Sequence, residues 1–402
     1  MGSSSEIRDW EVKYEPRRWQ EEALKRWKSD WSGVVKVVTG GGKTVFALFC
    51  VLEFVRTTDD PVIIVVVPTT ALLDQWYVSF VEELGVSEDE ISCFSGDYKP
   101  EDKSIINIIV INTARYKAKS ISKNRETFLI VDECHRAGSP ENSKSLEGQH
   151  KATLGLSATP ERKQDEGFDK YIKPSLGPII YSYDYNEARR DEVIAPFDLV
   201  NVQVRLLPPE EEKYNSLTKK LAIAGRKYDS GEISEDRFKA VARKRASVSN
   251  NAIMRVPVAA KLVESHRGQR SIVFHESIDA ADRISEILDE RSHRVAVYHS
   301  GIGPALRRNN LRLYRQGIFD VLVTCRALDE GMNVPETEVA VVASSTSSER
   351  QRIQRLGRVL RPSSEKERAL IYTLFATDTE KKRLRKESDT LEGVANIKWM
   401  QS

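Results

Sequence analysis

Short apolar runs recur along the chain and are separated by segments of helical length. In the first half they occupy residues 34–38, 62–67, 105–111, 128–132 and 153–157. Such runs, rich in Val and Ile and without polar alternation, are typical of parallel strands that are buried on both faces. Segments of helical length, such as residues 21–30 and 69–84, lie between most of them. This alternation predicts an α/β domain with a doubly wound parallel sheet.

A second series of five runs predicts a second α/β domain of similar size. These runs occupy residues 271–274, 294–298, 320–325, 338–343 and 369–374. The predicted organisation is a first domain at residues 7–200, a helical insertion or linker at 201–257, a second domain at 258–388 and a tail at 389–402. We expect the end of the chain, from residue 379, to be a charged helix that frays. The opening MGSSS resembles an expression-tag scar and is excluded from fold reasoning.

The amino-acid composition of residues 208–247 differs from that of both series of apolar runs. It is charged, lacks strand-like runs and holds ten basic residues among seven acidic ones. We interpret it as a helical insertion or hinge. A solvated helical face is one reading, because interleaved charges usually serve solubility. A surface that contacts a partner is the other.

Composition limits the class of protein. The chain has 62 basic and 60 acidic residues, so its formal net charge is only +2 and any polyanion must be bound by local patches. The four cysteines lie far apart, which favours a reducing compartment over a disulfide framework. No apolar run approaches the roughly 20 residues of a membrane span, and no signal peptide opens the chain. We therefore predict an intracellular, soluble protein without a membrane partner.

Three consecutive glycines in the stretch VVTGGGKTVF stand between a predicted strand and a helical stretch. The residues of this loop are Thr39, Gly40, Gly41, Gly42, Lys43 and Thr44. Glycines let the backbone curl so that several N–H groups point at a phosphate, next to a helix N-terminus. Lys43 would reach the β and γ phosphates of ATP, and the Thr44 hydroxyl would bind Mg²⁺. The match is partial because Val37 stands where this motif usually has a small residue, and a glycine-rich turn is the alternative.

Four side chains able to bind a transition metal follow another apolar run: Asp132, Glu133, Cys134 and His135. Zinc fits poorly, because neighbouring strand side chains point to opposite faces and zinc ligands usually have spacers of two to four residues. Ligands of open parallel sheets bind at the carboxyl ends of strands. There Asp132 would hold Mg²⁺, usually through water, and Glu133 would orient and deprotonate an attacking water. Cys134 is then a small buried filler, and His135 a polar side chain facing the second domain.

Four motifs coincide in order and spacing: VTGGGKT at residues 38–44, DECH at 132–135, GLSATPER at 155–162 and QRIQRLGRVLRP at 351–362. Together they resemble the superfamily 2 helicases of DExH type, over residues 10–379. Through RRWQEEAL at 17–24 and VTCRALDEGMNVPE at 323–336, the chain is similar to the XPB/UvsW-like group. The resemblance implies two tandem RecA-like parallel-sheet domains with a helical insertion between them.

The resemblance also assigns residues to the nucleotide base and ribose. Gln20 matches the residue that reads the adenine edge, with Arg17 nearby, although RRWQ alone could be an ordinary amphipathic helix start. Gly331 is assigned to the nucleotide on the same ground. Asn333 stands where many relatives have Asp, so a ribose contact there loses its charge.

Two arginines near the end of the second domain are implied as catalytic residues. Arg358 and Arg361 fall three apart, so on a helix they share a face. The family places both against the γ-phosphate as arginine fingers, with Gln354 beside them, and such a finger is worth roughly three to five orders of magnitude in rate. Ser157 and Thr159 match the element that links hydrolysis to movement. A solvated basic helix and a polar turn are the respective alternatives.

Three threonines match family positions that contact the nucleic-acid backbone: Thr69, Thr113 and Thr324. Hydroxyls suit phosphate contacts, which hold a strand without reading its sequence. Each threonine could instead cap the end of an element. The implied partner is DNA, single-stranded or forked, with RNA as an alternative and a protein such as a nuclease as a possible further partner. The insertion at 208–247 is implied to act as a thumb on the duplex.

The resulting hypothesis is an ATP-dependent helicase that moves along DNA and unwinds or remodels duplexes, in the cytoplasm with the nucleoid or in the nucleus. A double-strand translocase or annealing motor that never unwinds is an alternative. A binding or regulatory module with a degenerate ATPase core is another. The sequence leaves open DNA against RNA, the direction of movement, the oligomeric state and the pathway.

Overall fold

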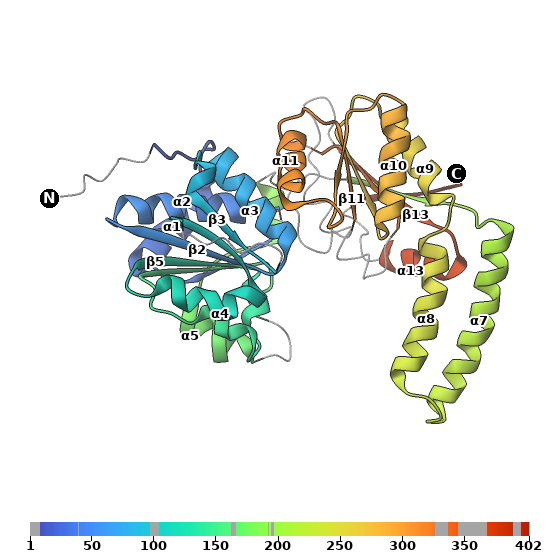
Figure 1. Ribbon diagram of the computed structural model, residues 1–402, viewed down its shortest axis with the longest axis horizontal. Helices are drawn as coiled ribbons and strands as arrows, with labels where there is room; N and C mark the ends of the chain where they lie inside the picture. The colour runs from blue at the N-terminus through green and yellow to red at the C-terminus, as the bar shows by residue number, and fades with distance from the viewer. Residues whose placement is uncertain are drawn as a thin grey trace. The chain divides into compact units, whose positions relative to one another are not determined.

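The computed structural model describes most of the chain, and its described residues form two compact units (Figure 1). The described residues are 9–38, 40–96, 104–161, 166–191, 193, 197–325, 337–344, 368–388 and 395–401. The first unit holds the described residues up to Val193, and the second holds those from Phe197 onward. The division therefore falls a few residues before residue 200, where the sequence predicted the first domain to end.

The first unit is a parallel sheet in the order β3-β4-β2-β5-β6-β1-β7. Its strands are β1 (Val34–Val37), β2 (Pro61–Val67), β3 (Ile91–Phe94), β4 (Ile106–Val110), β5 (Glu126–Asp132), β6 (Ala152–Ser157) and β7 (Ile179–Tyr183). Its helices are α1 (Arg18–Asp30), α2 (Lys43–Arg56), α3 (Thr70–Glu83), α4 (Ile111–Ser122), α5 (Lys173–Leu176) and α6 (Tyr185–Arg190). Short helical turns are η1 (Glu88–Glu90), η2 (Cys134–Ala137), η3 (Asn142–Leu146) and η4 (Phe168–Ile172).

Alternate residues of β2 enter two different cores, as expected of a strand covered on both faces. Ile63 and Val65 pack in the core that α1, α2 and α3 complete. Ile64 and Val66 pack in the core that includes the apolar side of α4. Every residue of β2 is buried, which explains why its sequence is an unbroken apolar run.

The second unit is a parallel sheet in the order β10-β11-β9-β12-β13-β8-β14. Its strands are β8 (Phe197–Gln203), β9 (Ser271–His275), β10 (Val295–Tyr298), β11 (Val321–Cys325), β12 (Val339–Val342), β13 (Ala369–Phe375) and β14 (Ala395–Gln401). Its helices are α7 (Pro208–Asp229), α8 (Glu235–Asn250), α9 (Arg255–Glu264), α10 (Ile278–Glu290), α11 (Pro304–Arg315) and α13 (Asp378–Ser388). Helices α9 and α10 cover one face of this sheet, where Val273 and Val341 are buried (Figure 1).

The sequence did not predict β8 and β14, the two strands at one end of the second sheet. β8, which the predicted domain boundary at residue 200 divides, pairs with β13 and β14 along its whole length. The expectation of a charged helix from residue 379 onward is only half right, because α13 ends at Ser388 and β14 follows. At the start of these strands Arg368 Nε donates to Asp198 Oδ1 at 2.6 Å, and Asn396 Nδ2 donates to the same oxygen at 3.2 Å.

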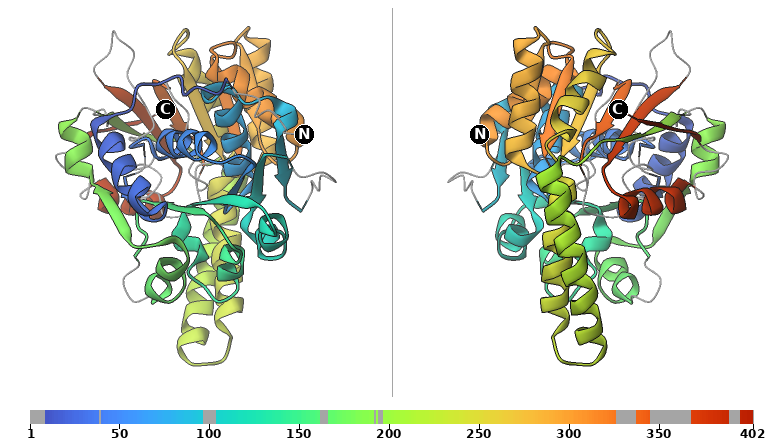
Figure 2. Two further views of the ribbon diagram at one scale, coloured as in Figure 1. Left: turned by 90° about the vertical axis from the view of Figure 1, so that its left-hand side faces the viewer. Right: turned by 90° about the vertical axis from the view of Figure 1, so that its right-hand side faces the viewer.

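The predicted helical insertion is a hairpin of two antiparallel helices, α7 and α8, which lie side by side in every view (Figures 1 and 2). Its seam is thin and contains Ala224 and the stacked rings of Tyr228 and Phe238, 5.5 Å apart. At the root, Glu210 accepts the N–H groups of Leu207 at 2.8 Å and Ile253 at 2.9 Å. The hairpin is therefore fixed at its root, and most of its length is exposed.

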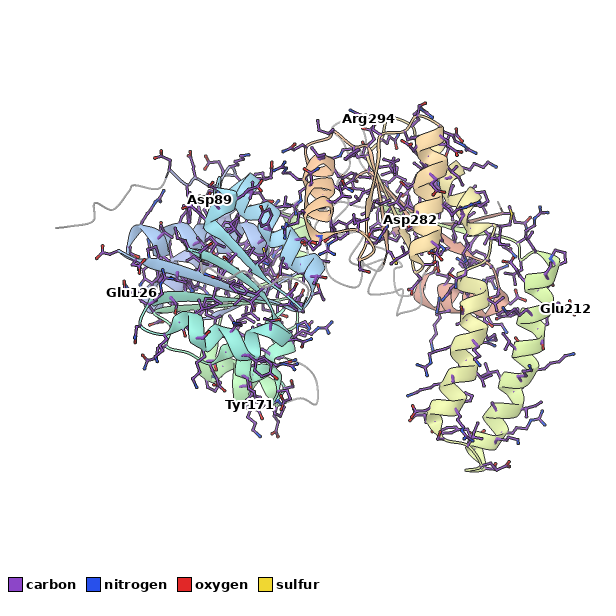
Figure 3. All side chains as sticks on the ribbon, in the orientation of Figure 1. Asp89, Glu126, Tyr171, Glu212, Asp282 and Arg294 are labelled. Carbon is purple, nitrogen blue, oxygen red and sulfur yellow. The ribbon has the colours of Figure 1, made fainter. Side chains whose placement is uncertain are left out.

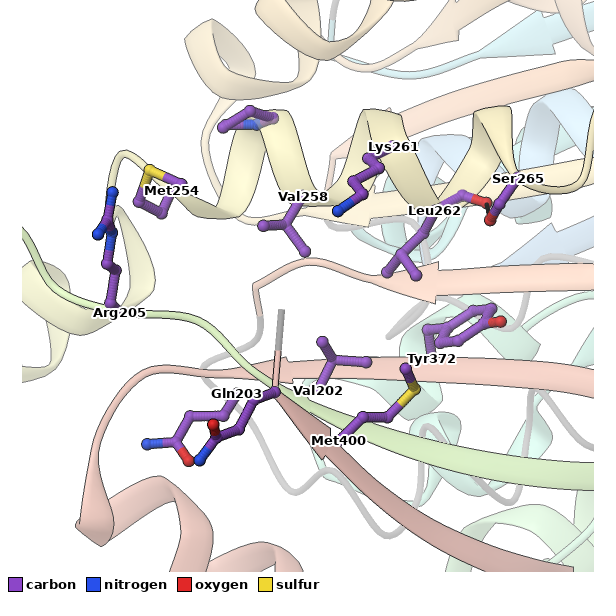
Figure 4. Close-up of a pocket in the computed structure, with 12 residues that line it drawn as sticks. Val202, Gln203, Arg205, Met254, Val258, Lys261, Leu262, Ser265, Tyr372 and Met400 are labelled. Atoms are coloured by element: carbon purple, nitrogen blue, oxygen red, sulfur yellow. Dashed lines mark hydrogen bonds between the residues drawn. The ribbon is translucent and has the colours of Figure 1, made fainter.

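A groove of about 800 Å³ lies between α9 and the strands β8, β13 and β14 of the second sheet (Figure 4). Val202, Leu262 and Met400 give it an apolar lining, and Arg205 and Lys261 lie among its lining residues. In the part of the chain that the structure describes, no helix is both long and apolar enough to cross a bilayer.

We predict that Gly155→Ala destabilises the first unit by about 1–3 kcal/mol, because the added methyl overpacks its core. A Cβ there would lie 2.9 Å from Val34 Cγ2 and 3.3 Å from Cys134 Sγ. Urea unfolding followed by tryptophan fluorescence measures this, since all the tryptophans except Trp399 precede residue 195. Gly96→Ala is the matched control, because a Cβ there meets no atom within 4 Å. Equal midpoints for the two variants would contradict the packing argument.

Candidate active site

The glycine loop joins the end of β1 to the start of α2, as the sequence predicted. Gly40 and Gly42 have φ values of 81° and 97°, a left-handed conformation that favours glycine. Gly41 is required for another reason: a Cβ there would lie 2.7 Å from Val37 Cγ1. The bulky Val37, which made the motif match partial, is thus accommodated by the missing side chain of Gly41.

Helix α1 holds this loop through two side chains. Trp19 Nε1 donates to the carbonyl of Gly41 at 3.1 Å, and Gln20 Nε2 donates to the carbonyl of Gly42 at 3.0 Å. Gln20 Oε1 accepts the N–H of Arg17 at 2.8 Å, and the Gln20 residue is 2% exposed. The structure therefore brings Arg17 and Gln20 to the loop, where Gln20 supports the backbone. Sequence reasoning overlooked Trp19, although it lies inside the motif RRWQ.

Asp132 ends β5 with both carboxylate oxygens engaged. Trp76 Nε1, from α3, donates to Oδ2 at 2.9 Å, and the N–H of Glu133 donates to Oδ1 at 2.9 Å. Burial, and after it the adjacent Glu133 carboxylate, raise the pKa of Asp132 above its usual range. Sequence reasoning did not identify Trp76, because nothing in the spacing of LLDQW indicates a partner 56 residues away.

Glu133 follows in an unusual backbone conformation, with φ 47° and ψ 50°. A non-glycine residue rarely occupies this left-handed region, which is strained and common at functional sites. The turn directs the side chain towards the glycine loop, where Glu133 Oε1 lies 4.0 Å from Lys43 Nζ. Lys43 Nζ also donates to the carbonyl of Val37 at 3.4 Å. The predicted phosphate ligand and the predicted base thus face each other.

His135 connects this pair to the SAT element. Its Nδ1 lies 3.3 Å from Glu133 Oε2 and forms a hydrogen bond of 2.9 Å with Ser157 Oγ, in which the tautomer of the ring decides the donor. Ser157 Oγ also accepts the N–H of Thr159 at 3.1 Å. The sequence predicted a polar role for His135 facing the second domain, and the described contacts place its ring against Ser157. Ser157 and Thr159 are therefore in direct contact with the residues around Glu133.

Cys134 packs inside the core, as the sequence predicted for a small buried filler. It is fully buried, and burial raises the pKa of its thiol well above the usual range. The oxygen donors nearest the loop are Asp132, Glu133 and the Thr44 hydroxyl at the start of α2. Two adjacent carboxylates, one buried with a raised pKa, suit a cation with oxygen ligands such as Mg²⁺. Asp132 and Thr44 would hold that ion.

The three threonines predicted to contact nucleic acid have different surroundings. Thr69 caps α3, accepting the N–H of Leu72 at 3.3 Å, which is the alternative role that the sequence left open. Thr113 lies in the first turn of α4 and is partly exposed. Thr324 is fully buried in β11 of the second unit, and its hydroxyl has no hydrogen-bond partner among the described residues.

Part of the predicted site lies outside the described residues. Thr39, Gly331, Gln354, Arg358 and Arg361 belong to this group. Their assignments rest on the sequence motifs.

Comparisons with known proteins agree with this geometry. A family described as "Type III restriction enzyme, res subunit" matches residues 13–162, and one described as "Helicase conserved C-terminal domain" matches residues 254–363. The first match includes the glycine loop and the DECH motif, and the second includes the predicted arginine fingers.

Relatives of known name match along most of the chain. A Rad25 protein of Haloarcula marismortui is 28% identical over 90% of this chain and 53% of its own length. The "DNA 3'-5' translocase XPB2" of Sulfurisphaera tokodaii is 28% identical over 89% of this chain and 81% of its own length. The chain thus spans between about half and four-fifths of the length of these relatives.

A solved structure supports the fold. The Dbp5 protein of S. cerevisiae, bound to RNA and ADP BeF3, matches with a TM-score of 0.63 at 14% identity, over 96% of this chain and 90% of that one. At this identity the match concerns the fold alone, and it confirms the prediction of two tandem RecA-like domains. The two family matches and the XPB and Rad25 relatives lead to one conclusion: the chain belongs to the superfamily 2 helicases.

Proposed function

We propose that this chain is an ATP-driven motor that moves along DNA with 3'-5' polarity and separates or remodels duplexes. The observation that carries the proposal is the approach of Lys43 Nζ to Glu133 Oε1, 4.0 Å apart, beside the buried Asp132. A cation for phosphate, a base for water and a carboxylate for a metal ion are the parts that phosphoryl transfer to water requires. The relatives, a DNA 3'-5' helicase and a DNA 3'-5' translocase, support the DNA substrate and the polarity.

In the proposed reaction each residue of the first unit has one task. The N–H groups of Gly40 and Gly42 bind the phosphates of ATP, and Lys43 neutralises the developing negative charge. The N–H of Gly41 donates to the carbonyl of Val38 at 3.0 Å, so its predicted phosphate contact requires this bond to break. Glu133 accepts the proton of the attacking water. Asp132 and Thr44 would hold Mg²⁺, and the ion would supply positive charge that offsets the charge of the phosphates.

Residues of the second unit complete the proposed site on the evidence of the sequence. Arg358 and Arg361 are expected to stabilise the transferred phosphoryl group, and Gln354 to assist them. The hydrogen bonds from Glu133 through His135 to Ser157 support a link between the state of the nucleotide and the SAT element.

Helix α3 gives a physical route from nucleic acid to the metal ligand. Thr69, a predicted backbone contact, caps its N-terminus, and Trp76 on the same helix donates a hydrogen bond to Asp132. A nucleic-acid strand that binds at the N-terminus of α3 can therefore shift the Asp132 carboxylate of the proposed ATP site, because a helix moves as a rigid element.

The charge distribution on the helical hairpin supports a second contact with nucleic acid. The acidic residues near its root, among them Glu212, precede the long exposed part of α7 (Figure 3). Residues 213–228 and 237–250 then hold five basic residues each and no acidic one. Two of these basic residues, Lys227 and Lys239, pair with Glu232 and Glu235 at the turn of the hairpin. The others lie along the two helices and attract phosphates, which favours the contact reading over a mixed, solvated face.

A translocase that does not separate strands is the second candidate, favoured by the printed name of the S. tokodaii relative. The two differ in a strand-displacement assay. A protein partner such as a nuclease, and a location with the nucleoid or in the nucleus, stay predictions.

The experiment that tests the proposed function measures ATP hydrolysis against single-stranded DNA, duplex DNA, forked DNA and RNA in parallel. We expect at least one DNA to stimulate hydrolysis above the rate without nucleic acid. A protein that hydrolyses no ATP with any of the four would instead be a binding or regulatory module.

We predict that Lys43→Ala and Glu133→Gln each abolish ATP hydrolysis. Lys43 is expected to act at the phosphates and Glu133 at the attacking water, so Glu133→Gln should retain nucleotide affinity while Lys43→Ala loses much of it. Steady-state hydrolysis and the binding of a fluorescent ATP analogue measure the two effects. Turnover close to the unmodified level in either variant would refute its assigned role.

We predict that Trp76→Phe raises the Mg²⁺ concentration for half-maximal hydrolysis by about 10- to 100-fold, the usual effect of losing a hydrogen bond to a metal ligand. Direct Mn²⁺ binding, measured by electron paramagnetic resonance in the presence of a non-hydrolysable ATP analogue, should weaken similarly. Trp27→Phe is the control, because Trp27 Nε1 donates to the Thr153 carbonyl, away from the loop. An unchanged Mn²⁺ affinity in Trp76→Phe would rule out this role.

We predict that Lys219→Ala with Lys220→Ala weakens duplex binding and lowers its dependence on salt. Each lost phosphate contact should reduce the slope of log affinity against log salt by about 0.9. Fluorescence anisotropy at several salt concentrations measures the slope. The control removes Lys227 and Lys239, which form ion pairs with Glu232 at 3.7 Å and Glu235 at 2.7 Å. A smaller effect of the first pair than of the control pair would show that the duplex binds elsewhere.

A further inference from the structure

Arg255, at the start of α9, is a buried charge with an unusually complete set of partners. The residue is 1% exposed. Its Nε donates to the carbonyl of Ser249 at 2.7 Å, and its Nη1 donates to the carbonyls of Ala343 at 2.6 Å and Leu374 at 2.8 Å. Its Nη2 donates to Glu380 Oε1 at 2.6 Å. One guanidinium group thus joins four separate segments of the second unit.

Glu380 extends the network on the other side. Its Oε2 accepts the N–H groups of Ala376 at 2.9 Å and Thr377 at 3.1 Å, and the Thr377 hydroxyl at 3.1 Å. Glu380 therefore fixes the turn between β13 and α13 while it neutralises Arg255. A buried ion pair is retained in a protein only when its charges and its hydrogen bonds are satisfied, as they are here.

The four segments belong to two different functional regions. Ser249 lies in the last turn of α8, at the root of the helical hairpin. Ala343 and Leu374 lie at the carboxyl ends of β12 and β13, the edge of a parallel sheet at which ligands bind. In the sequence, the QRLGRVLR motif with Arg358 and Arg361 follows β12.

We propose that Arg255 is a positioning residue that couples the helical hairpin to the end of β12, and thereby couples nucleic-acid binding to ATP hydrolysis. The inference rests on the proposed function and adds to it a route inside the second unit. A displacement of α8 moves Ser249, and Arg255 transmits it to Ala343 because its planar fork holds both carbonyls at fixed geometry. Lysine has a single nitrogen and cannot reproduce that geometry.

The test compares Arg255→Lys and Glu380→Gln with Arg368→Lys. Arg368 is the matched control because it also joins an ion pair and a backbone carbonyl, donating to Asp198 Oδ1 at 2.6 Å and to the Phe197 carbonyl at 3.0 Å. These partners lie at the opposite, amino edge of the same sheet. Thermal unfolding identifies a temperature at which all three variants are folded.

The first measurement is hydrogen exchange with and without a bound DNA oligonucleotide. In the unmodified chain, binding should slow exchange both in the hairpin and at residues 339–344. In Arg255→Lys and Glu380→Gln, binding should still slow exchange in the hairpin but no longer at residues 339–344. In Arg368→Lys, binding should slow exchange in both places. The inference is overturned if both variants keep the effect at residues 339–344, if the control loses it equally, or if the unmodified chain does not show it.

The second measurement is the stimulation of ATP hydrolysis by the same oligonucleotide. Stimulation should fall by about 10- to 100-fold in Arg255→Lys, since small misplacements far from the chemistry can have effects of this size. Oligonucleotide affinity and the KM for ATP should stay unchanged, which a general loss of structure would not produce. Absence of hydrolysis in the unmodified chain refutes the proposed function, whereas the exchange comparison still decides the role of Arg255.

Discussion

Burial of both faces of the parallel strands is the constraint on which the rest of this molecule depends. Because alternate residues of β2 enter two separate cores, this central strand is apolar throughout, and charged side chains of the site lie where the strands end. Lys43, Asp132, Glu133 and Ser157 all lie at or just beyond the carboxyl ends of β1, β5 and β6, which are neighbours in the sheet. The site is thus a consequence of strand order, and the glycine loop and DECH motif meet because parallel strands end at one edge.

Hydrogen bonds from helices then give this edge its shape. Indole and amide groups of α1 hold two carbonyls of the glycine loop, and an indole of α3 orients Asp132. These donors come from elements on one face of the sheet, so a change in either helix reaches the nucleotide site directly. In the second unit a helix side chain also donates hydrogen bonds to the ends of strands, since the guanidinium group of Arg255 bonds to the carbonyls at the ends of β12 and β13.

Much of this could be predicted from the sequence, and the failures have physical causes. Long apolar runs such as residues 62–67 identify central strands, and the glycine loop and DECH identify the catalytic edge, because both depend on local composition. β8 and β14 were missed because FDLVNVQ and ANIKWMQ mix polar with apolar residues at one end of the sheet, where burial is less complete. Trp76 and Arg255 were missed because their partners are 56 and up to 125 residues away, and no local pattern encodes such contacts.

The shape of the hairpin has a mechanical consequence. Helix α7 has 22 residues, which at the rise of an α-helix is a rod of roughly 33 Å. Glu210 on α7, and Arg255 through Ser249 on α8, hold the hairpin at its base, so a tilt there is amplified along its length. A tilt of about 10° at the base would carry the far end through roughly 6 Å. That travel is close to the length of two base pairs at about 3.4 Å each, which is the scale of the proposed movement along a duplex.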